Sequence, residues 1–282
     1  MKKQEKLLLI DGNAILHRAY HALPALTDKR GRLVNAVYGF ASILLKAFRE
    51  IKPKYIAAAF DLAGPTFRHK LFKEYKAKRV KAPQELYDQL PIIKKLLKAF
   101  NIPAFEKQGY EADDIIGTIS YQPIKTIILT GDLDTLQLVD KNTQILTGLK
   151  DMTFYDIKKI KERYDLTPKQ IIDFKALKGD ASDNIPGVPG IGEKTAIELL
   201  KKYKTLKNIY NNLDAIKQST RKKLEDFYEQ ALFSKKLATI IRNVPIKFDL
   251  DKCLALGYNK NKVINFFKEL GFTSLIQRLE RG

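Results

Sequence analysis

Nine carboxylates stand in five tight clusters along this chain of 282 residues. They follow three apolar runs, open one helical segment and occupy one loop: Asp11, Asp61, Glu111, Asp113, Asp114, Asp132, Asp134, Asp180 and Asp183. Like charges that meet in space destabilise a fold unless cations neutralise them. Ligands that are all oxygen atoms select hard cations, so Mg²⁺ or Mn²⁺ is expected rather than Zn²⁺. Nine acids exceed the needs of one ion, and two adjacent ions could clamp the attacking and leaving oxygens of a phosphodiester.

The elements that carry these acids are typical of a parallel α/β sheet. Four apolar runs predict strands, and amphipathic patterns predict helices between them. The strand ranges are 7–10, 55–60, 125–130 and 144–147, and the helical ranges are 34–50 and 84–100. Asp11, Asp61 and the pair Asp132 and Asp134 each follow a predicted strand. Because the carboxyl ends of parallel strands meet at one edge of a sheet, we expect these acids to share that edge.

Each acidic cluster also has an ordinary structural explanation. Asp is favoured in turns and loops, and a helix start favours acids such as Asp113 and Asp114 because of the helix dipole. The pattern nevertheless recurs in five clusters, and three of them are expected at one sheet edge. This recurrence favours a shared function over five independent turns and caps.

In the second part of the chain the strand pattern fades and helical patterns take over. We expect a helix over about 167–177, after which a run rich in glycine and proline, 186–192, leads into a helix over 193–203. The chain therefore divides into an α/β catalytic region over residues 1–165 and a helical region over residues 166–282.

The composition is that of an ordinary globular protein with an excess of basic residues. The formal net charge is +19, which suits a polyanionic partner, although a lysine-rich proteome is the alternative explanation. The single cysteine, Cys253, excludes an internal disulfide, and the small number of histidines argues against a Cys/His zinc site. The apolar runs are too short to span a bilayer or to form a signal peptide, so we expect a cytosolic location.

Two segments outside the acidic clusters suit nucleic acid. The first, 66–81, interleaves cations with aromatic rings, which suits a single strand whose bases stack and whose phosphates pair; its alternative explanation is a solvated helix face. The second, 187–196, is rich in glycine and leads into a helix whose free N–H groups can meet a phosphate, with Lys194 in the first turn. A glycine-rich turn alone is weak evidence, and this one lacks the spacing of a Walker loop.

Several uncommon motifs occur in a fixed order along nearly the whole chain. They are Ile10-Asp-Gly12, Arg18-Ala-Tyr-His-Ala22, Ala36-Val-Tyr-Gly-Phe40, Phe60-Asp61, Phe67-Arg68, Tyr75-Lys76, Gly109-Tyr-Glu-Ala-Asp-Asp114, Thr130-Gly-Asp-Leu-Asp134, Gln137-Leu138, Gly179-Asp-Ala-Ser-Asp-Asn-Ile-Pro-Gly187 and Gly190-Ile-Gly-Glu-Lys-Thr-Ala196. In these motifs the chain resembles the 5′ nuclease (flap endonuclease) family, and most closely the 5′→3′ exonuclease domain at the N-terminus of bacterial polymerases of type I.

The resemblance implies a fold and a set of ligands. The implied fold is a PIN-like, mostly parallel central sheet flanked by helices, with a helical arch over about residues 66–100. A helix–three-turn–helix element over about 179–203 would grip duplex DNA, in some members with a bound K⁺. The implied ligands of the first metal are Asp11, Asp61, Glu111, Asp113 and Asp114, and those of the second are Asp132, Asp134, Asp180 and Asp183.

The resemblance also implies DNA contacts. Lys76 and Arg79 match arch residues that orient the scissile phosphate, and Arg18 matches a basic residue near the 5′ side. The remaining implied DNA contacts are Arg68, Tyr75 as a base-stacking residue, and Gly190, Gly192, Lys194 and Thr195 of the duplex-binding hairpin. Leu133 departs from relatives that often carry Lys at its position, so one basic contact is absent.

The implied activity is metal-dependent hydrolysis of DNA near the junction of a 5′ single strand and a duplex, by a 5′→3′ exonuclease and flap endonuclease. The implied substrates are 5′ flaps, nicked or gapped duplexes and RNA primers on DNA, in replication and repair. We expect a monomer in the cytoplasm, at the bacterial nucleoid, working with a DNA polymerase and without a membrane. The chain ends where a polymerase portion would follow, which predicts a stand-alone nuclease, with a fragment of a longer gene product as the alternative.

Two rival functions remain at this point. A non-catalytic duplex-DNA-binding protein would use the acids as turns and caps, but the complete acid set favours catalysis. A PIN-type ribonuclease would share the acids, but the hairpin over Gly190–Ala196 favours duplex DNA.

Overall fold

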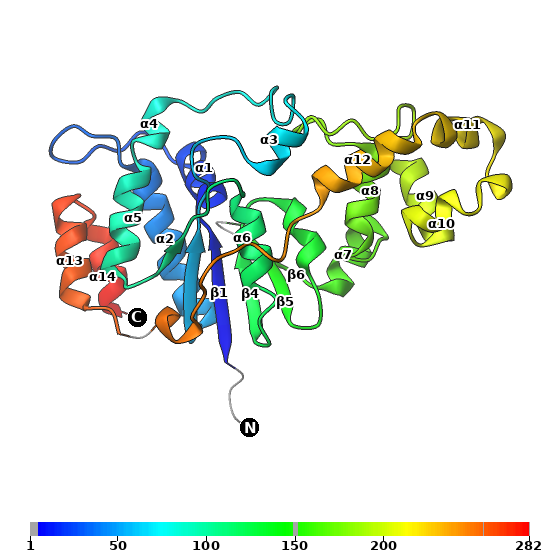
Figure 1. Cartoon of the computed structure of the whole chain (residues 1–282). Helices are drawn as coiled ribbons and strands as arrows, with labels where there is room; N and C mark the ends of the chain where they lie inside the picture. The colour runs from blue at the N-terminus through cyan, green and yellow to red at the C-terminus, as the bar shows by residue number, and fades with distance from the viewer. Residues whose placement is uncertain (1–4, 149–151, 256, 282) are drawn as a thin grey trace.

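A mostly parallel sheet forms the centre of the protein (Figure 1). The computed structural model describes residues 5–148, 152–255 and 257–281. Within these ranges a sheet of six strands has the order β3-β2-β1-β4-β5-β6, and the β5–β6 pair is antiparallel. The strands are β1 (Lys6–Asp11), β2 (Tyr55–Ala59), β3 (Ala104–Phe105), β4 (Lys125–Leu129), β5 (Thr143–Thr147) and β6 (Thr153–Tyr155). The four predicted strands are confirmed, whereas β3 and β6 are too short to give a pattern.

Helices cover the first face of the sheet. They are α1 (Gly12–Ala22), α2 (Asn35–Ile51) and α5 (Leu90–Ala99). Successive side chains of a strand point to opposite faces, and β1 directs Leu8 and Ile10 into the apolar cluster on this side. Phe40 and Leu44 of α2 belong to the same cluster, as the predicted helical period requires.

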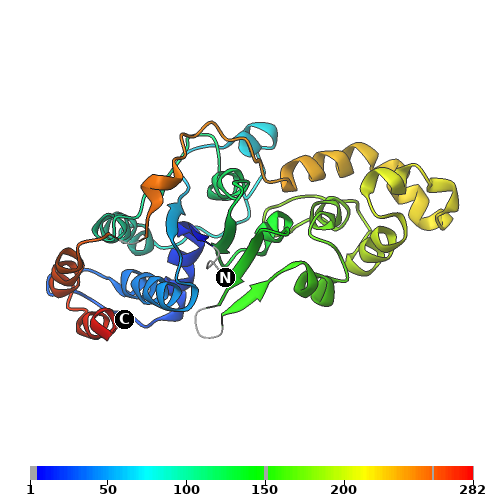
Figure 2. The ribbon, with the colours of Figure 1, turned by 90° about the horizontal axis from the view of Figure 1, so that it is seen from below.

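A thinner layer covers the second face. It consists of α6 (Ala112–Ile119), the 3₁₀ helix η1 (Leu133–Leu138), α7 (Ile157–Tyr164) and the irregular residues 239–249, called the strap below. Leu7 and Leu9 of β1 share an apolar cluster with Ile115 of α6 and with Ile240 and Val244 of the strap. Figure 2 shows α6 and the orange strap on the side of the sheet opposite α2.

A group of helices, called the helical body below, extends beyond the β6 edge of the sheet (Figure 1). It contains α8 (Gln170–Lys178), α9 (Glu193–Tyr203), α10 (Leu206–Tyr210), the 3₁₀ helix η2 (Leu213–Ala215), α11 (Gln218–Asp226) and α12 (Tyr228–Ala238). Its core includes Leu177, Leu200 and Leu224. Gly179 and Gly187 close the α8–α9 loop with positive φ, and a Cβ on Gly187 would lie 2.3 Å from the backbone nitrogen of Gly179.

The segment expected to form a helical arch contains less helix than the basic run suggested. It contains α3 (Phe67–Leu71), a stretch of turns, the short α4 (Gln84–Tyr87) and α5, so the helix expected over 84–100 is divided in two just before Pro91. Phe72 leaves helical geometry with φ −146°. Lys76 adopts a positive φ of 57°, and its N–H donates to the carbonyl of Asp183 at 2.9 Å. Local turn hydrogen bonds and the contacts of residues 74–79 to the α8–α9 loop therefore stand in place of a continuous helix here.

The end of the chain returns to the first face of the sheet. The 3₁₀ helix η3 (Leu250–Cys253) still packs on the second face through Cys253, and the elements on the first face are α13 (Lys260–Glu269) and α14 (Thr273–Arg281). Phe267 and Leu275 belong to the same apolar cluster as α2. The expected helical region, 166–282, is thus divided in space, because its last helices pack with the catalytic region. No helix in the described parts of the chain is both long and apolar enough to cross a bilayer.

Candidate active site

A cavity of about 600 Å³ lies at the carboxyl edge of the sheet. Six of the nine predicted acids line it, namely Asp11, Asp61, Glu111, Asp113, Asp132 and Asp134. Arg18, Lys76 and Arg79 line the same cavity, so acids and bases face one another there. The neighbouring parallel strands β2, β1 and β4 end at this edge, which is why acids distant in sequence meet.

Asp11 and Asp61 also bind backbone groups, as Asp132 does by accepting the N–H of Asp134 at 2.8 Å at the start of η1. Asp11 accepts the N–H of Ala14 at 3.0 Å as the N-cap of α1, and its second oxygen accepts the hydroxyl of Thr130 at 2.6 Å. Asp61 accepts the N–H of Ala112 at 2.7 Å, at the start of α6. The capping explanation is therefore correct for these side chains, and it accompanies their convergence on the cavity.

Burial and nearby negative charge raise the pKa of four cavity acids, Asp11, Asp61, Asp113 and Asp134. Burial raises the pKa of Asp11 to about 7, and the charge of Asp132 adds to the effect. Burial, followed by the charge of Asp132, raises the pKa of Asp134 to about 6. The same two causes raise the pKa of Asp113 well above its usual value. An all-oxygen set with excess negative charge fits a hard divalent cation.

Protein cations lie among these acids. Within the described ranges, no three acidic, histidine or cysteine side chains converge closely enough to hold an ion as they stand. Lys76 Nζ donates to Glu111 Oε2 at 3.0 Å. Lys175 of α8 bonds both Asp134 and Asp180. The ammonium groups therefore supply positive charge where the acid set calls for a cation, and ion binding would require them to move aside.

Asp180 and Asp183 lie on the α8–α9 loop and do not line the cavity. Burial opposes ionisation of Asp180, but the charge of Lys175 outweighs it and lowers its pKa to about 2. Asp183 accepts the hydroxyl of Tyr75 at 3.0 Å and the guanidinium of Arg79. The arch segment and the helical body thus meet at Asp183, beside the cavity.

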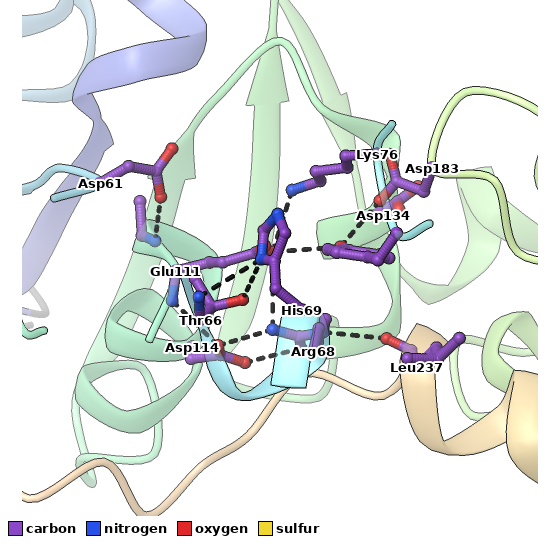
Figure 3. Close-up of polar contacts among 12 residues, drawn as sticks. Asp61, Thr66, Arg68, His69, Lys76, Glu111, Asp114, Asp134, Asp183 and Leu237 are labelled. Carbon is purple, nitrogen blue, oxygen red and sulfur yellow. Dashed lines mark hydrogen bonds and ion pairs between the residues drawn. The ribbon is translucent and has the colours of Figure 1, made fainter. Parts of the chain in front are cut away.

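Three predicted site residues lie in the interior. Figure 3 shows two of them, Arg68 and Asp114, side by side. Arg68 is 3% exposed and forms a bidentate pair with Asp114, which is 0% exposed. Tyr75 is 3% exposed, and its hydroxyl donates to Glu111 and Asp183. These positions do not fit a DNA contact for Arg68, base stacking for Tyr75 or an open ligand position for Asp114.

The predicted duplex-binding hairpin lies on the surface of the helical body. Gly190, Gly192 and Lys194 are exposed, and Thr195 is partly exposed. α9 starts at Glu193 without a side-chain cap, so its first N–H groups remain available to a phosphate. Lys223 supports the loop by donating to the carbonyl of Gly190 at 3.0 Å.

The sequence reasoning missed several supporting residues. Thr130 positions Asp11, and Asn13 accepts the N–H of Asp61 at 2.9 Å. His17 lines the cavity. Lys175 bridges two acids, but it stands among many lysines and its sequence context carries no signal. Thr130 and Asn13 each lie within two residues of a predicted acid at a strand end, a position that could have drawn attention to them.

A second cavity, of about 1050 Å³, lies at the opposite edge of the sheet, where the strands begin. Lysines such as Lys6, Lys125 and Lys141 line it together with Glu50 and Asp140. It contains none of the nine predicted acids. We therefore place the candidate chemistry in the smaller cavity, where the acids converge.

Comparison with solved structures supports the fold. The T5 D15 protein co-crystallised with metal ions superposes with a TM-score of 0.72 at 19% identity, over 98% of this chain and 100% of that one. The catalytic core of Rad2 in complex with DNA substrate gives a TM-score of 0.62 at 17% identity, over 98% and 93% of the two chains. At these identities the likeness shows a shared fold, as the sequence resemblance predicted.

Sequence comparison identifies the family. DNA polymerase I of Bacillus subtilis (strain 168) is 47% identical over 287 residues, which cover 99% of this chain and 33% of the relative. DNA polymerase I of Caldicellulosiruptor bescii is 45% identical over 283 residues, which cover 97% and 33%. The chain thus spans about a third of the length of these curated relatives. The 5′-3′ exonuclease N-terminal resolvase-like domain matches residues 6–165, and the 5′-3′ exonuclease C-terminal SAM fold matches residues 166–261, so the chain belongs to the 5′-3′ exonuclease family.

Proposed function

We propose that this protein is a structure-specific nuclease that hydrolyses DNA phosphodiesters near the junction of a 5′ single strand and a duplex. The observation that carries the proposal is the convergence of six carboxylates with Arg18, Lys76 and Arg79 on one cavity. A phosphodiester is an anion, and its hydrolysis needs both charge neutralisation and an activated water. Acids that hold cations, facing bases that hold phosphate, meet both needs.

Divalent Mg²⁺ or Mn²⁺ is the proposed cofactor, as two ions held by the cavity acids. When bound, these ions would polarise the scissile phosphate and lower the pKa of water. We assign Asp11, Asp61, Glu111 and Asp113 to one group and Asp132 and Asp134 to the other, with Asp180 and Asp183 as outer members of the second group. Support comes from their oxygen-only chemistry and from the pKa values of Asp11 and Asp134 near 7 and 6.

Basic side chains would place the substrate against this acid group. Lys76 and Arg79 are held at the cavity by Glu111 and Asp183, so they are poised to exchange a carboxylate for a phosphate. Arg18 lines the same cavity from α1 and would hold the 5′ side of the strand. The predicted products are a 5′-phosphate and a 3′-hydroxyl.

The helical body would hold the duplex. The exposed loop at Gly190 and Gly192 permits close approach of a backbone, and Lys194 adds a charge to the uncapped start of α9. We further propose K⁺ at this element, the use of RNA primers on DNA as substrates, and work beside a DNA polymerase, as a monomer in the bacterial cytoplasm at the nucleoid. The polymerase relationship is supported by relatives that are named DNA polymerase I.

A cleavage assay tests the proposal. The purified protein is mixed with labelled 5′-flap, nicked duplex and matched RNA substrates in Mg²⁺, Mn²⁺ or chelator. We expect cleavage of the flap near the junction, and loss of cleavage in chelator. Failure to cut DNA with either metal, or faster cutting of the matched RNA, would contradict the proposal.

Lys194 tests the duplex contact separately. Lys194→Gln should reduce the slope of log affinity against log salt by about one, because one phosphate-contacting cation is lost. Lys262→Gln, an exposed lysine on α13, is the matched control and should leave the slope unchanged. Equal slopes in all three proteins would remove Lys194 from the interface.

A further inference from the structure

One acid of the predicted set faces away from the cavity. Asp114 of α6 is fully buried, and Arg68 donates to both of its carboxylate oxygens at 2.8 Å. The N–H of Ile241 donates to Oδ1 at 2.8 Å, and the N–H of Glu111 donates to Oδ2 at 3.1 Å. A carboxylate has about four acceptor positions. Protein donors therefore use the full capacity of Asp114.

We propose that Asp114 and Arg68 form a positioning clamp for the nuclease reaction and that Asp114 is no metal ligand. The clamp joins three segments: α3 at the base of the arch, α6 with the cavity acids, and the strap that follows the helical body. This inference rests on the proposed nuclease function, and it assigns Asp114 a role different from the one the family resemblance implies.

Arg68 connects the arch to the helical body. Besides Asp114, it donates from Nε to the carbonyl of Leu237 at 2.9 Å and from Nη2 to the carbonyl of Thr239 at 2.8 Å. Both carbonyls lie at the C-terminal end of α12, where the helix dipole favours a cation. One guanidinium thus caps α12 and holds α6 at the same time.

Asp114 connects this junction to the cavity. It forms a reciprocal capping box with Glu111, so its position fixes the first turn of α6. Glu111 in turn accepts the hydroxyl of Tyr75 at 3.2 Å and the ammonium of Lys76 at 3.0 Å. The direction of Glu111 and its neighbour Asp113 therefore depends on where the clamp holds α6.

A second contact ties the other acid group to the same strap. Gln137 of η1 donates to the carbonyls of Ala238 and Asp134, each at 3.0 Å, and accepts the N–H of Ile240 at 2.9 Å. Asp114 anchors the strap to α6, and Gln137 anchors it to the element that carries Asp134. A shift of α12 that displaces the strap therefore acts on both acid groups.

A double-mutant cycle tests the clamp. Asp114→Asn, Arg68→Gln and the double variant are assayed on flap DNA below their unfolding temperatures, and Mn²⁺ binding is measured by calorimetry. We expect each single variant to lower kcat about tenfold, as is typical when groups that orient ligands are removed. The double variant should match the single ones, because both changes break one interaction. KM for DNA and the number of bound Mn²⁺ ions should stay at the wild-type values.

The controls separate positioning from stability and from metal ligation. Asp173→Asn weakens the pair of the buried Asp173 with the partly exposed Lys235 in the helical body (2.7 Å) and should leave kcat unchanged. Arg68→Lys keeps the charge but loses the bidentate fork, so it should lower kcat by less than Arg68→Gln does. It replaces Arg68→Gln in the assay if that variant fails to fold. The clamp is overturned if Asp114→Asn alone loses an Mn²⁺ ion, if the two losses multiply, or if Asp173→Asn lowers kcat equally. A wild-type protein that cuts no DNA refutes the proposed function instead, and the Mn²⁺ data still decide whether Asp114 is a ligand.

Discussion

Acidic and basic side chains of the candidate site pair in two places, at the clamp and at the cavity acids, and the two places differ in how firmly the partners are held. At the clamp, Arg68 and Asp114 have side chains 3% and 0% exposed and are joined by two parallel hydrogen bonds. At the cavity acids Glu111 and Asp134, the side chains of Lys76 and Lys175 are 22% and 13% exposed and reach the acids as single ammonium groups. An arginine fork fixes geometry, whereas an ammonium is a mobile point charge.

This difference teaches that one residue pattern can serve two purposes. The clamp is built to persist, because separating its members would leave a buried charge without a partner. The cavity pairs are built to exchange, because their acids can accept another cation. Adjacent residues of α6 serve both purposes: Asp113 lines the cavity and Asp114 lies in the clamp.

The largest expected effect lies on the cavity side. Asp134→Asn should lower the rate of Mg²⁺-dependent flap cleavage on the order of 10³-fold, since metal-ion stabilisation is worth several kcal/mol. Single-turnover assays at saturating protein measure the rate, and a gel-shift assay confirms that duplex binding persists. Unchanged turnover would show that Asp134 takes no part in the reaction. It would also contradict the claim that the acid of the Lys175–Asp134 pair accepts a catalytic cation.

The clamp should contribute more to the free energy of unfolding than the pairs at the cavity acids do. Arg68→Met leaves Asp114 buried and unpaired, so we expect it to lower the free energy of unfolding by about 3 kcal/mol. Urea unfolding followed by circular dichroism measures the change. A loss below about 1 kcal/mol, the size of an exposed ion pair, would place the clamp in the same class as the cavity pairs.

Lys175, which pairs with the cavity acid Asp134, offers the stability test that matches Arg68→Met. Lys175→Gln should lower the free energy of unfolding by only about 1 kcal/mol, because the pair is partly exposed. Since the variant exposes Asp134 and Asp180 to each other without a shared cation, Mn²⁺ should raise its unfolding temperature more than that of the wild type. Equal shifts on adding Mn²⁺ would show that Lys175 does not stand where a cation binds.

The smallest expected effect is a dependence of stability on pH through Asp180. Lys175 lowers the pKa of Asp180 to about 2, below its usual value of 3.8. The carboxylate therefore stabilises the fold fully above about pH 4, and this stabilisation is lost as the pH falls toward 2. The difference in unfolding temperature between the wild type and Asp180→Asn should shrink over that interval. A difference that stays constant from pH 5 to pH 2 would contradict the assignment.

The sequence predicted the edge of the sheet better than the interior. Apolar runs at β1, β2 and β4 predicted the strands, and parallel order alone then brought Asp11, Asp61 and Asp132 together. The burial of Arg68 and Tyr75 could not be predicted. A sequence run that alternates basic and aromatic residues has the same pattern whether it faces solvent or packs into the interior. Arg68 contacts α12 and the strap, and Tyr75 packs with Leu237 of α12, all more than 150 residues away in sequence.

The different surroundings of Asp113 and Asp114 in α6 could not be predicted from the sequence either. Neighbouring residues on a helix point about 100° apart, and here Asp113 lines the cavity whereas Asp114 does not. Asp114 instead binds Arg68 and the N–H of Ile241, and both arrive through tertiary packing. The packing of α13 and α14 against α2 likewise could not be predicted from the local pattern. An amphipathic pattern predicts that one face of a helix is buried, but it does not indicate which element covers that face.

Because α13 and α14 pack on α2, the protein should stay assembled after a single cut in the helical body. The helical body is an insertion: the chain enters it after α7 and leaves it through the strap, and residues on both sides of it share one apolar core. A protease that nicks the exposed stretch around Asn211–Lys217 would produce two fragments. Phe267, Leu275 and Leu279 of the second fragment remain buried with α2 of the first. The severed halves would therefore travel together in a native gel and separate only in denaturant.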